Sequence, residues 1–318
     1  MEKIWIGFII FLCGAAMICA ASVNYAYEHN YDSFRFIWGF RMVSLKNTKE
    51  FPAEEIENIN IAYSSQNIIF LKEKADKIVI KEYLRSDSKD TSRIEMEENT
   101  LYVQRDVGIN EVFLFGTERI EIYLPESYRG NIKVAVSSGN ITADSVWSFN
   151  EFDALAKSGN ITCDEIEAQK ITAAASSGNI TFGKAQGIRY LMTSSGNIRV
   201  SAGVGDTYAE AISGNIDVEG ASGNFKASTH SGNIKAEFNS LGKTVEAETN
   251  SGNIHMYIPK DSAFSYEASA GSGLIVTNFK ENLSYNEKGN KASGTYGENI
   301  KTAITTSTTS GNAFVKLQ

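Results

Sequence analysis

Hydrophobic and polar residues alternate in short runs along most of the chain, and a recurring tetrapeptide, Ser-Gly-Asn-Ile, separates the runs. The tetrapeptide first occurs at residues 138–141 and returns, with a period of about 19 residues, almost to the C-terminus. Alternation with period 2 is typical of a strand that buries one face. A short unit repeated at a fixed period predicts an all-β solenoid in which equivalent residues of successive turns stack on one another.

The complete copies share a glycine followed by an asparagine. Their glycines are Gly139, Gly159, Gly178, Gly196, Gly214, Gly232 and Gly252, and their asparagines are Asn140, Asn160, Asn179, Asn197, Asn215, Asn233 and Asn253. Eroded copies follow at Gly273, Gly294 and Gly311, and related pairs lie halfway between the main copies at 130–131, 223–224 and 242–243. We therefore expect about ten turns of a β-helix or β-roll, each with two corners and two short strands.

Alignment of the copies on the asparagine predicts which side chains form the core. The next residue is Ile in every complete copy, and the third residue after the asparagine is apolar, as at Cys163 and Phe182. The second residue after it is Thr, Arg, Asp, Lys or His, so we expect this position to face solvent. The position four before the asparagine holds small residues. Such a core is thin, as expected where two sheets press closely together.

The corner residues themselves have a structural interpretation. Glycine reaches positive φ without steric cost, and asparagine tolerates the left-handed region better than most residues. Identical side chains stacked at a strand spacing of about 4.8 Å can hydrogen-bond along the column. We therefore interpret the asparagines as a structural ladder. Three copies also match the Asn-X-Thr glycosylation pattern, but the repeat explains them without a sugar.

The N-terminal part differs in composition from the repeats. Residues 4–23 form an uncharged apolar run that is long enough to cross the hydrocarbon core of a membrane as a helix. Lys3 precedes the run, whereas Glu28 and Asp32 follow it, so we expect a single-pass anchor with the C-terminal domain outside the cell. The alternative is secretion, because the segment Ala20-Ala21-Ser22 resembles a signal-peptidase site.

Four regions are therefore expected along the chain. They are a membrane anchor or signal segment over 1–23, an aromatic-rich juxtamembrane stalk over 24–55, irregular β turns with a cap over 56–130, and the regular solenoid over 131–318. A solenoid needs an atypical first turn because its terminal strand edge must be hidden. Residues 312–318 resemble a last strand with no following cap, which would leave an open end for self-association.

Composition and candidate chemistry narrow the function classes. The formal net charge of −8 argues against nucleic acid as a partner. Cys163 is the only cysteine after the apolar run, so no disulfide is expected within the exported part. Its inward position predicts a small core residue.

No arrangement of chemical groups predicts an active site. The histidines, His29, His230 and His255, show neither metal-ligand spacing nor a partnered nucleophile. Asp144 and Asp164 occupy equivalent positions on adjacent turns, where they form either a calcium site or, as we favour, a solvated face. We expect no catalytic residue, no cofactor and no metal.

Two segments carry a resemblance to a known family. The segment Ile120-Glu-Ile-Tyr-Leu-Pro125, followed by Val134-Ala-Val136 and the Ser-Gly-Asn-Ile corners, resembles the bacterial putative-adhesin family of β-strand-repeat domains. The later segment Met256-Tyr-Ile-Pro259, followed by Gly271-Ser-Gly273, is similar to the closing half of the same domain. The resemblance covers most of residues 56–318. It implies an exported or membrane-anchored bacterial protein and offers no catalytic residues to transfer.

The sequence thus favours a non-enzymatic interaction module of the cell envelope, displayed outside the bacterial membrane. Its expected partner is an envelope protein or a cell-wall component. A self-assembling structural scaffold is the alternative, since stacked β turns with a bare edge can polymerise. A polysaccharide-acting β-helix enzyme is disfavoured, because it would need carboxylates with Arg or Lys clustered across neighbouring turns, where the repeats mostly place Thr, Ser and Lys.

Overall fold

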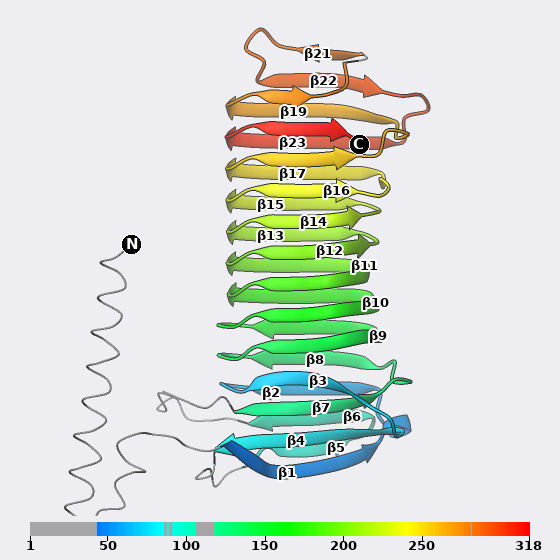
Figure 1. Cartoon of the computed structure of the whole chain (residues 1–318), viewed down its shortest axis with the longest axis vertical. Coiled ribbons are helices and arrows are strands. Elements are labelled where there is room, and N and C mark those ends of the chain that lie inside the picture. The colour runs from blue at the N-terminus through cyan, green and yellow to red at the C-terminus, as the bar shows by residue number, and fades with distance from the viewer. Residues whose placement is uncertain (1–42, 86–87, 89–90, 106–117, 281) are drawn as a thin grey trace, which may run out of the picture.

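The computed structural model describes residues 43–85, 88, 91–105, 118–280 and 282–318. These residues form a tall stack of strands that run back and forth across its long axis (Figure 1). The elements are β1 (Val43–Pro52), η1 (Ala53–Glu55), β2 (Asn58–Tyr63), β3 (Asn67–Glu73), β4 (Lys77–Arg85), β5 (Arg93–Glu97), β6 (Thr100–Arg105), β7 (Arg119–Pro125), β8 (Asn131–Val136), β9 (Ile141–Ala156), β10 (Ile161–Ser177), β11 (Ile180–Ser195), β12 (Ile198–Val204), β13 (Thr207–Ser213), β14 (Ile216–Ala221), β15 (Phe225–Ser231), β16 (Ile234–Phe238), β17 (Thr244–Ser251), β18 (Ile254–Ile258), β19 (Phe264–Ser272), β20 (Ile275–Thr277), β21 (Leu283–Tyr285), β22 (Lys291–Tyr296), β23 (Thr302–Ser310) and β24 (Ala313–Leu317).

The strands form two facing layers. The first layer has the order β1-β4-β7-β3-β9-β10-β11-β12-β14-β16-β18-β24-β20. The second layer has the order β5-β6-β2-β8-β9-β10-β11-β13-β15-β17-β23-β19-β22-β21. Pairing is parallel through the body of the stack and antiparallel only near its two ends. The all-β solenoid-like architecture predicted from the repeat is therefore confirmed.

The core lies between the layers and follows the predicted alternation. The Ile after each complete corner asparagine is buried, as are the apolar residues two positions later, including Cys163 and Phe182. Successive turns are in register, so Ile161 of β10 lies beside Ile180 of β11. Cys163 is a free thiol within this core, as expected, and burial raises its pKa.

Three turns depart from the expected pair of short strands. Strands β9, β10 and β11 are long and continue without a break from the first layer into the second. They bend at register shifts, between Cys163 and Glu165 and between Glu167 and Lys170, instead of at a glycine–asparagine corner. The prediction of two corners in every turn is wrong for this part of the stack.

Both ends of the stack are assembled out of chain order. The turn made by β2 and β3 lies between the later β6–β7 and β8–β9 turns. Likewise, the final turn, β23 and β24, lies between the β17–β18 and β19–β20 turns. The C-terminal strand therefore has a partner on each side, and the expectation that residues 312–318 leave an open edge is wrong.

The predicted corner at Gly294 is wrong. Gly294 belongs to β22, which pairs antiparallel with both β19 and β21 and so covers one layer at this end. A Cβ at Gly294 would lie 2.0 Å from the carbonyl oxygen of Asn282, so the glycine is required by close strand contact. Antiparallel covering strands limit edge-to-edge association.

The predicted N-terminal segments fall mostly outside the described residues. The anchor over 1–23 and the first part of the stalk belong to this group, as does His29. Within the described part of the chain, no helix is both long enough and apolar enough to span a membrane. The end of the expected stalk, Val43–Pro52, is strand β1 and pairs with β4.

Candidate interaction surface

The predicted corner asparagines form one continuous column along an edge of the stack, which we call the first edge. Each side-chain Oδ1 accepts a hydrogen bond from the backbone N–H of the asparagine in the next turn, at 2.8–2.9 Å. The column starts at Asn67, continues from Asn140 through Asn253 to the inserted Asn312, and ends at the backbone N–H of Leu274. The repeat did not predict Asn67, because Gln66 precedes it in place of the corner glycine.

The glycines of this edge are needed for a different reason from the one expected. At Gly159, Gly178 and Gly196, a Cβ atom would lie 1.9–2.0 Å from the carbonyl oxygen of the preceding corner glycine. None of the corner asparagines has positive φ, and among the glycines of the complete copies only Gly232 and Gly252 do, at 158° and 154°. Contact between the backbones of successive turns therefore excludes a side chain along this edge, and positive φ adds to that contact at Gly232 and Gly252.

Buried threonines complete the first edge. The hydroxyls of Thr193, Thr229, Thr249 and Thr308 each donate a hydrogen bond to a corner glycine carbonyl of the neighbouring turn, at 3.0–3.1 Å. This explains why the position four before the asparagine is small. The structure therefore places the asparagines and glycines of all seven complete copies in a backbone scaffold.

The opposite edge, which we call the second edge, is interrupted. Asn58, Asn131 and Asn150 are linked by side-chain amide bonds of 2.7–2.8 Å at one end, and Asp206, Asn224 and Lys243 by bonds to backbone N–H groups further along. Between these two groups lies the fully buried Arg189. Its guanidinium donates to the carbonyl oxygens of Ala185, Gly187, Val204 and Gly205 and to the hydroxyl of Thr207.

Where β11 lacks a second-edge corner, the charged side chain of Arg189 fills the interior between the layers. Burial lowers the pKa of its guanidinium to about 10, while Asp206 acts in the opposite direction. The group therefore remains a cation at neutral pH. Arg189 occupies an inward position of β11, whereas the apolar side chains of Ile188 and Met192 and the ring of Tyr190 face solvent.

These outward residues belong to a larger apolar surface on the second layer. Ala62, Ala135, Leu155, Ala174 and Met192 are in register across β2, β8, β9, β10 and β11, and we call them the apolar row. Leu155 is 49% exposed and Met192 is 45% exposed. Ile212 of β13, 54% exposed, lies near the end of the row. Contiguous exposed apolar side chains mark interaction sites more often than scattered ones do.

The row is limited to one half of the layer. Beyond Met192 the same register position is occupied by Glu210, Ser228, Glu248 and Ser307. The outer face of the first layer is also different, because its charges pair between turns, as in Lys184 with Glu165 and Lys235 with Glu219. The apolar row is therefore a local feature and not a property of the repeat.

A groove of about 460 Å³ adjoins the start of the row. Its lining comprises Ala62, Tyr63, Ser64, Arg105, Ala135, Val136, Ser137, Leu155, Lys157 and Ser176. Both charged residues of the lining are cations. The side chain of Arg105 is 10% exposed. Its guanidinium forms an ion pair with the Glu118 carboxylate at 3.5 Å and donates a hydrogen bond to the Ser88 hydroxyl at 2.8 Å. The groove thus combines an apolar floor, three serines and two positive charges.

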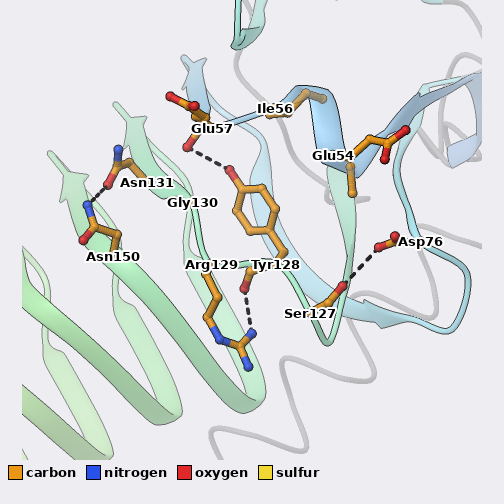
Figure 2. A pocket seen from close by; sticks show the side chains of 11 residues that line it. Glu54, Ile56, Glu57, Asp76, Ser127, Tyr128, Arg129, Gly130, Asn131 and Asn150 are labelled. Atoms are coloured by element: carbon orange, nitrogen blue, oxygen red, sulfur yellow. Dashed lines mark hydrogen bonds between the residues drawn. The ribbon is translucent and has the colours of Figure 1, made fainter.

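A second cavity, of about 480 Å³, lies at the second edge near η1, beside Asn131 and Asn150 (Figure 2). Most of its labelled polar groups bond to one another: Tyr128 donates to the backbone carbonyl of Glu57, Asn150 to Asn131, and Ser127 to Asp76. Burial raises the pKa of the Tyr128 hydroxyl. These mutual bonds favour a structural role for the cavity.

The remaining residues singled out by the sequence lie apart. His230, in the second layer, contacts Asn250, whereas His255, in the first layer, stacks on Phe314 with ring centroids 4.6 Å apart. Burial and the nearby Lys316 lower the pKa of His255. Asp144 and Asp164 lie on the neighbouring strands β9 and β10, and within the described ranges no group of three or more His, Cys, Asp or Glu could hold a metal ion.

Sequence reasoning missed both the apolar row and the groove. One signal was available: in β11 the alternation places Arg189 and Thr193 at inward positions and Ile188 and Met192 at outward ones. The repeat itself aligns Ala135, Leu155, Ala174 and Met192, each five residues before a corner asparagine, but it could not show that Ala62 joins this row, because β2 enters the stack out of chain order.

A comparison with known protein families finds a match for most of this chain. The family model described as Toastrack DUF4097 matches residues 56–316, a range that includes both segments on which the predicted resemblance rests, so that resemblance is confirmed. The chain matches no curated protein.

Several solved structures are similar at low sequence identity. A putative adhesin from Bacteroides fragilis has a TM-score of 0.46 and 16% identity, covering 86% of this chain and 97% of that one. A putative adhesin from Parabacteroides distasonis has a TM-score of 0.41 and 12% identity, covering 86% and 97%. A putative lipid binding protein from the same species has a TM-score of 0.40 and 16% identity, covering 86% and 96%.

Proposed function

Since this chain belongs to the Toastrack DUF4097 family, and since one of its faces exposes a row of apolar side chains, we propose that it is a non-enzymatic interaction module of the bacterial cell envelope. The module is displayed outside the membrane, attached through the apolar run at residues 4–23. Its contact surface is the apolar row of the second layer, and its partner is a component of the envelope.

The observation that carries this proposal is the exposure of Leu155 and Met192 in register on neighbouring parts of one flat face. A solvated solenoid face needs no large apolar side chains, since the other half of the same face has Glu and Ser at this register position. Leaving them exposed lowers solubility unless a partner covers them. The rigid ladder of the first edge holds the row in a fixed geometry, which lowers the entropic cost of binding.

Proximity crosslinking in intact cells tests the proposal. The full chain is compared with a Leu155→Ser/Met192→Ser variant and with Val204→Ser, which removes an apolar side chain that is 44% exposed on the other layer. We expect the double variant to lose specific envelope components that the full chain and the Val204→Ser control both retain. Identical crosslinking patterns for all three chains would overturn the proposal.

A further inference from the structure

The groove and the apolar row form one continuous site, because Ala62, Ala135 and Leu155 belong to both. Arg105 lies at the start of this site, since its strand β6 pairs with β2 and places Arg105 beside Tyr63. Lys157 follows Leu155 by two positions and so faces the same side of β9. The site therefore has one cation beyond its β2 end and a second beside Leu155, and the apolar row continues from Leu155 to Met192.

We propose that this site binds an anionic amphiphile with a single apolar chain in the groove. The inference rests on the proposed function and names the chemical class of its partner. The anionic headgroup lies between Arg105 and Lys157, where Ser64 and Ser137 supply hydroxyl donors. The apolar chain lies along the row toward Met192.

Charge selects the sign of the headgroup. Among the described residues, no carboxylate lines the groove: Glu118 lies behind Arg105 and is 7% exposed, and it also accepts a 2.7 Å hydrogen bond from Gln66. This arrangement orients the Arg105 guanidinium and leaves the positive charge of Lys157 to face the groove. A neutral headgroup would gain less from two cations than an anionic one does.

The length of the row fits an acyl chain. From Ala135 of β8, beside the headgroup position, to Met192 of β11 the row spans three strand spacings, about 14 Å, which is close to the apolar thickness of one membrane leaflet, about 15 Å. An acyl chain of membrane length therefore finds apolar side chains along its whole course. The polar residues that replace the row at Glu210 and beyond define where the apolar surface ends.

A sugar is a poorer fit to this face. Binding of a glycan by stacking needs an aromatic ring with an open face, but Tyr190 and Tyr208 stack on each other with centroids 5.0 Å apart and an interplanar angle of 9°. The Lys170 ammonium lies 6.0 Å from the Tyr190 ring centre. The stacked rings therefore present mainly their edges, which continue the apolar surface instead of offering a platform for sugar.

Site-specific photocrosslinking of the full chain in intact cells tests the assignment. A photoreactive amino acid is placed at Leu155, at Met192 or, as a control, at Val204, and the adducts are identified by mass spectrometry. We expect adducts of anionic amphiphiles at positions 155 and 192 at about ten times the yield at 204, and about tenfold less after Lys157→Gln, the effect of losing one charge-assisted hydrogen bond. Lys260→Gln, a substitution of an exposed lysine elsewhere, should leave the yield unchanged.

The outcomes separate the two proposals. An adduct mass with one acyl chain identifies a single-chain amphiphile, and one with two chains identifies a phospholipid with one chain in the groove; either supports the assignment. Adducts made only of protein or glycan at positions 155 and 192 would overturn it and leave the interaction surface standing. Neutral-lipid adducts insensitive to Lys157→Gln would also overturn it. Equal labelling at all three positions would overturn the interaction surface as well.

Discussion

The two edges of the stack obey different rules. Along the first edge, glycine and asparagine recur turn after turn, because the backbone of each corner touches that of the next and the Asn Oδ1 bonds across the contact. Along the second edge the column breaks after Asn150 of β9 and resumes at Asp206, and the side chain of Arg189 in β11 lies within this gap. The repeat is therefore strict only where successive backbones meet directly.

The break coincides with the surface that departs most from the repeat. Leu155, Ala174 and Met192 of the apolar row belong to the same three long strands. A strand without a second-edge corner does not need glycine and asparagine there. Its outward positions can therefore hold residues that serve contact with a partner. The regular edge supplies rigidity, whereas the irregular part supplies the candidate interaction surface.

The difference between the two edges predicts that the largest loss of stability follows substitution of a first-edge glycine. In Gly196→Val the new Cβ would lie 2.0 Å from the carbonyl oxygen of Gly178, so adjacent turns must separate. We expect a loss of about 4 kcal/mol in the free energy of unfolding, measured by denaturant titration. Ser194→Val, which adds the same side chain at an exposed position two residues earlier, should cost less than about 0.5 kcal/mol. Equal stability of both variants would refute the close-contact explanation.

A smaller loss is expected at the second edge. Arg189→Met keeps an unbranched side chain but removes the donors to the carbonyl oxygen of Ala185 and the hydroxyl of Thr207, both in buried hydrogen bonds. We expect destabilisation of about 2–3 kcal/mol. Arg189→Lys should lie between the wild type and Arg189→Met, because one ammonium cannot reach all of these oxygens. Denaturation midpoints for the three chains test the order. An unchanged midpoint for the Met variant would show that the hydrogen bonds of Arg189 do not stabilise the fold.

Single links in the asparagine column should matter less. Asn215→Ala removes the acceptor for the backbone N–H of Asn233 at 2.9 Å, yet water can replace it at this exposed position. We expect a loss of about 1 kcal/mol. The matched second-edge variant Asn224→Ala removes the acceptor for the N–H of Lys243 and should cost about the same. Thermal melting of both variants checks this, and a much larger loss at Asn215 alone would mean that the column acts cooperatively.

The smallest effect on stability is expected on the apolar row. In Leu155→Ser and Met192→Ser the altered side chains are about half exposed, so folding loses little buried area. We expect changes within about 0.5 kcal/mol while crosslinking to partners falls. A large fall in the melting temperature would instead assign these residues to the fold.

Much of this fold was predictable from the repeat. The alternation around each Ser-Gly-Asn-Ile copy predicted the buried Ile column and the small, thin core, because local periodicity fixes which side chains face inward. The out-of-order turns were not predictable. Strands β2 and β24 resemble ordinary first and last strands, and the sequence has no local signal for the slot that each one fills.

The candidate site depended on that same missing information. Ala62 of β2 reaches Ala135 of β8 only because the first turn lies beside a later one, and Arg105 borders the groove because β6 pairs with β2. The glycines show a subtler division: the sequence determined that the corners contain glycine, but only stacked turns reveal that a neighbouring carbonyl occupies the space of the Cβ.

The sequence by itself thus determined the all-β class, the period of the turns, the core positions and the family resemblance, since each depends on residues near one another in the chain. The tertiary structure decided the order of the end turns, the role of Arg189 and the joining of the apolar row to a cationic groove. These depend on which strands become neighbours, and pairing between distant segments is set by packing and hydrogen bonding of the whole stack.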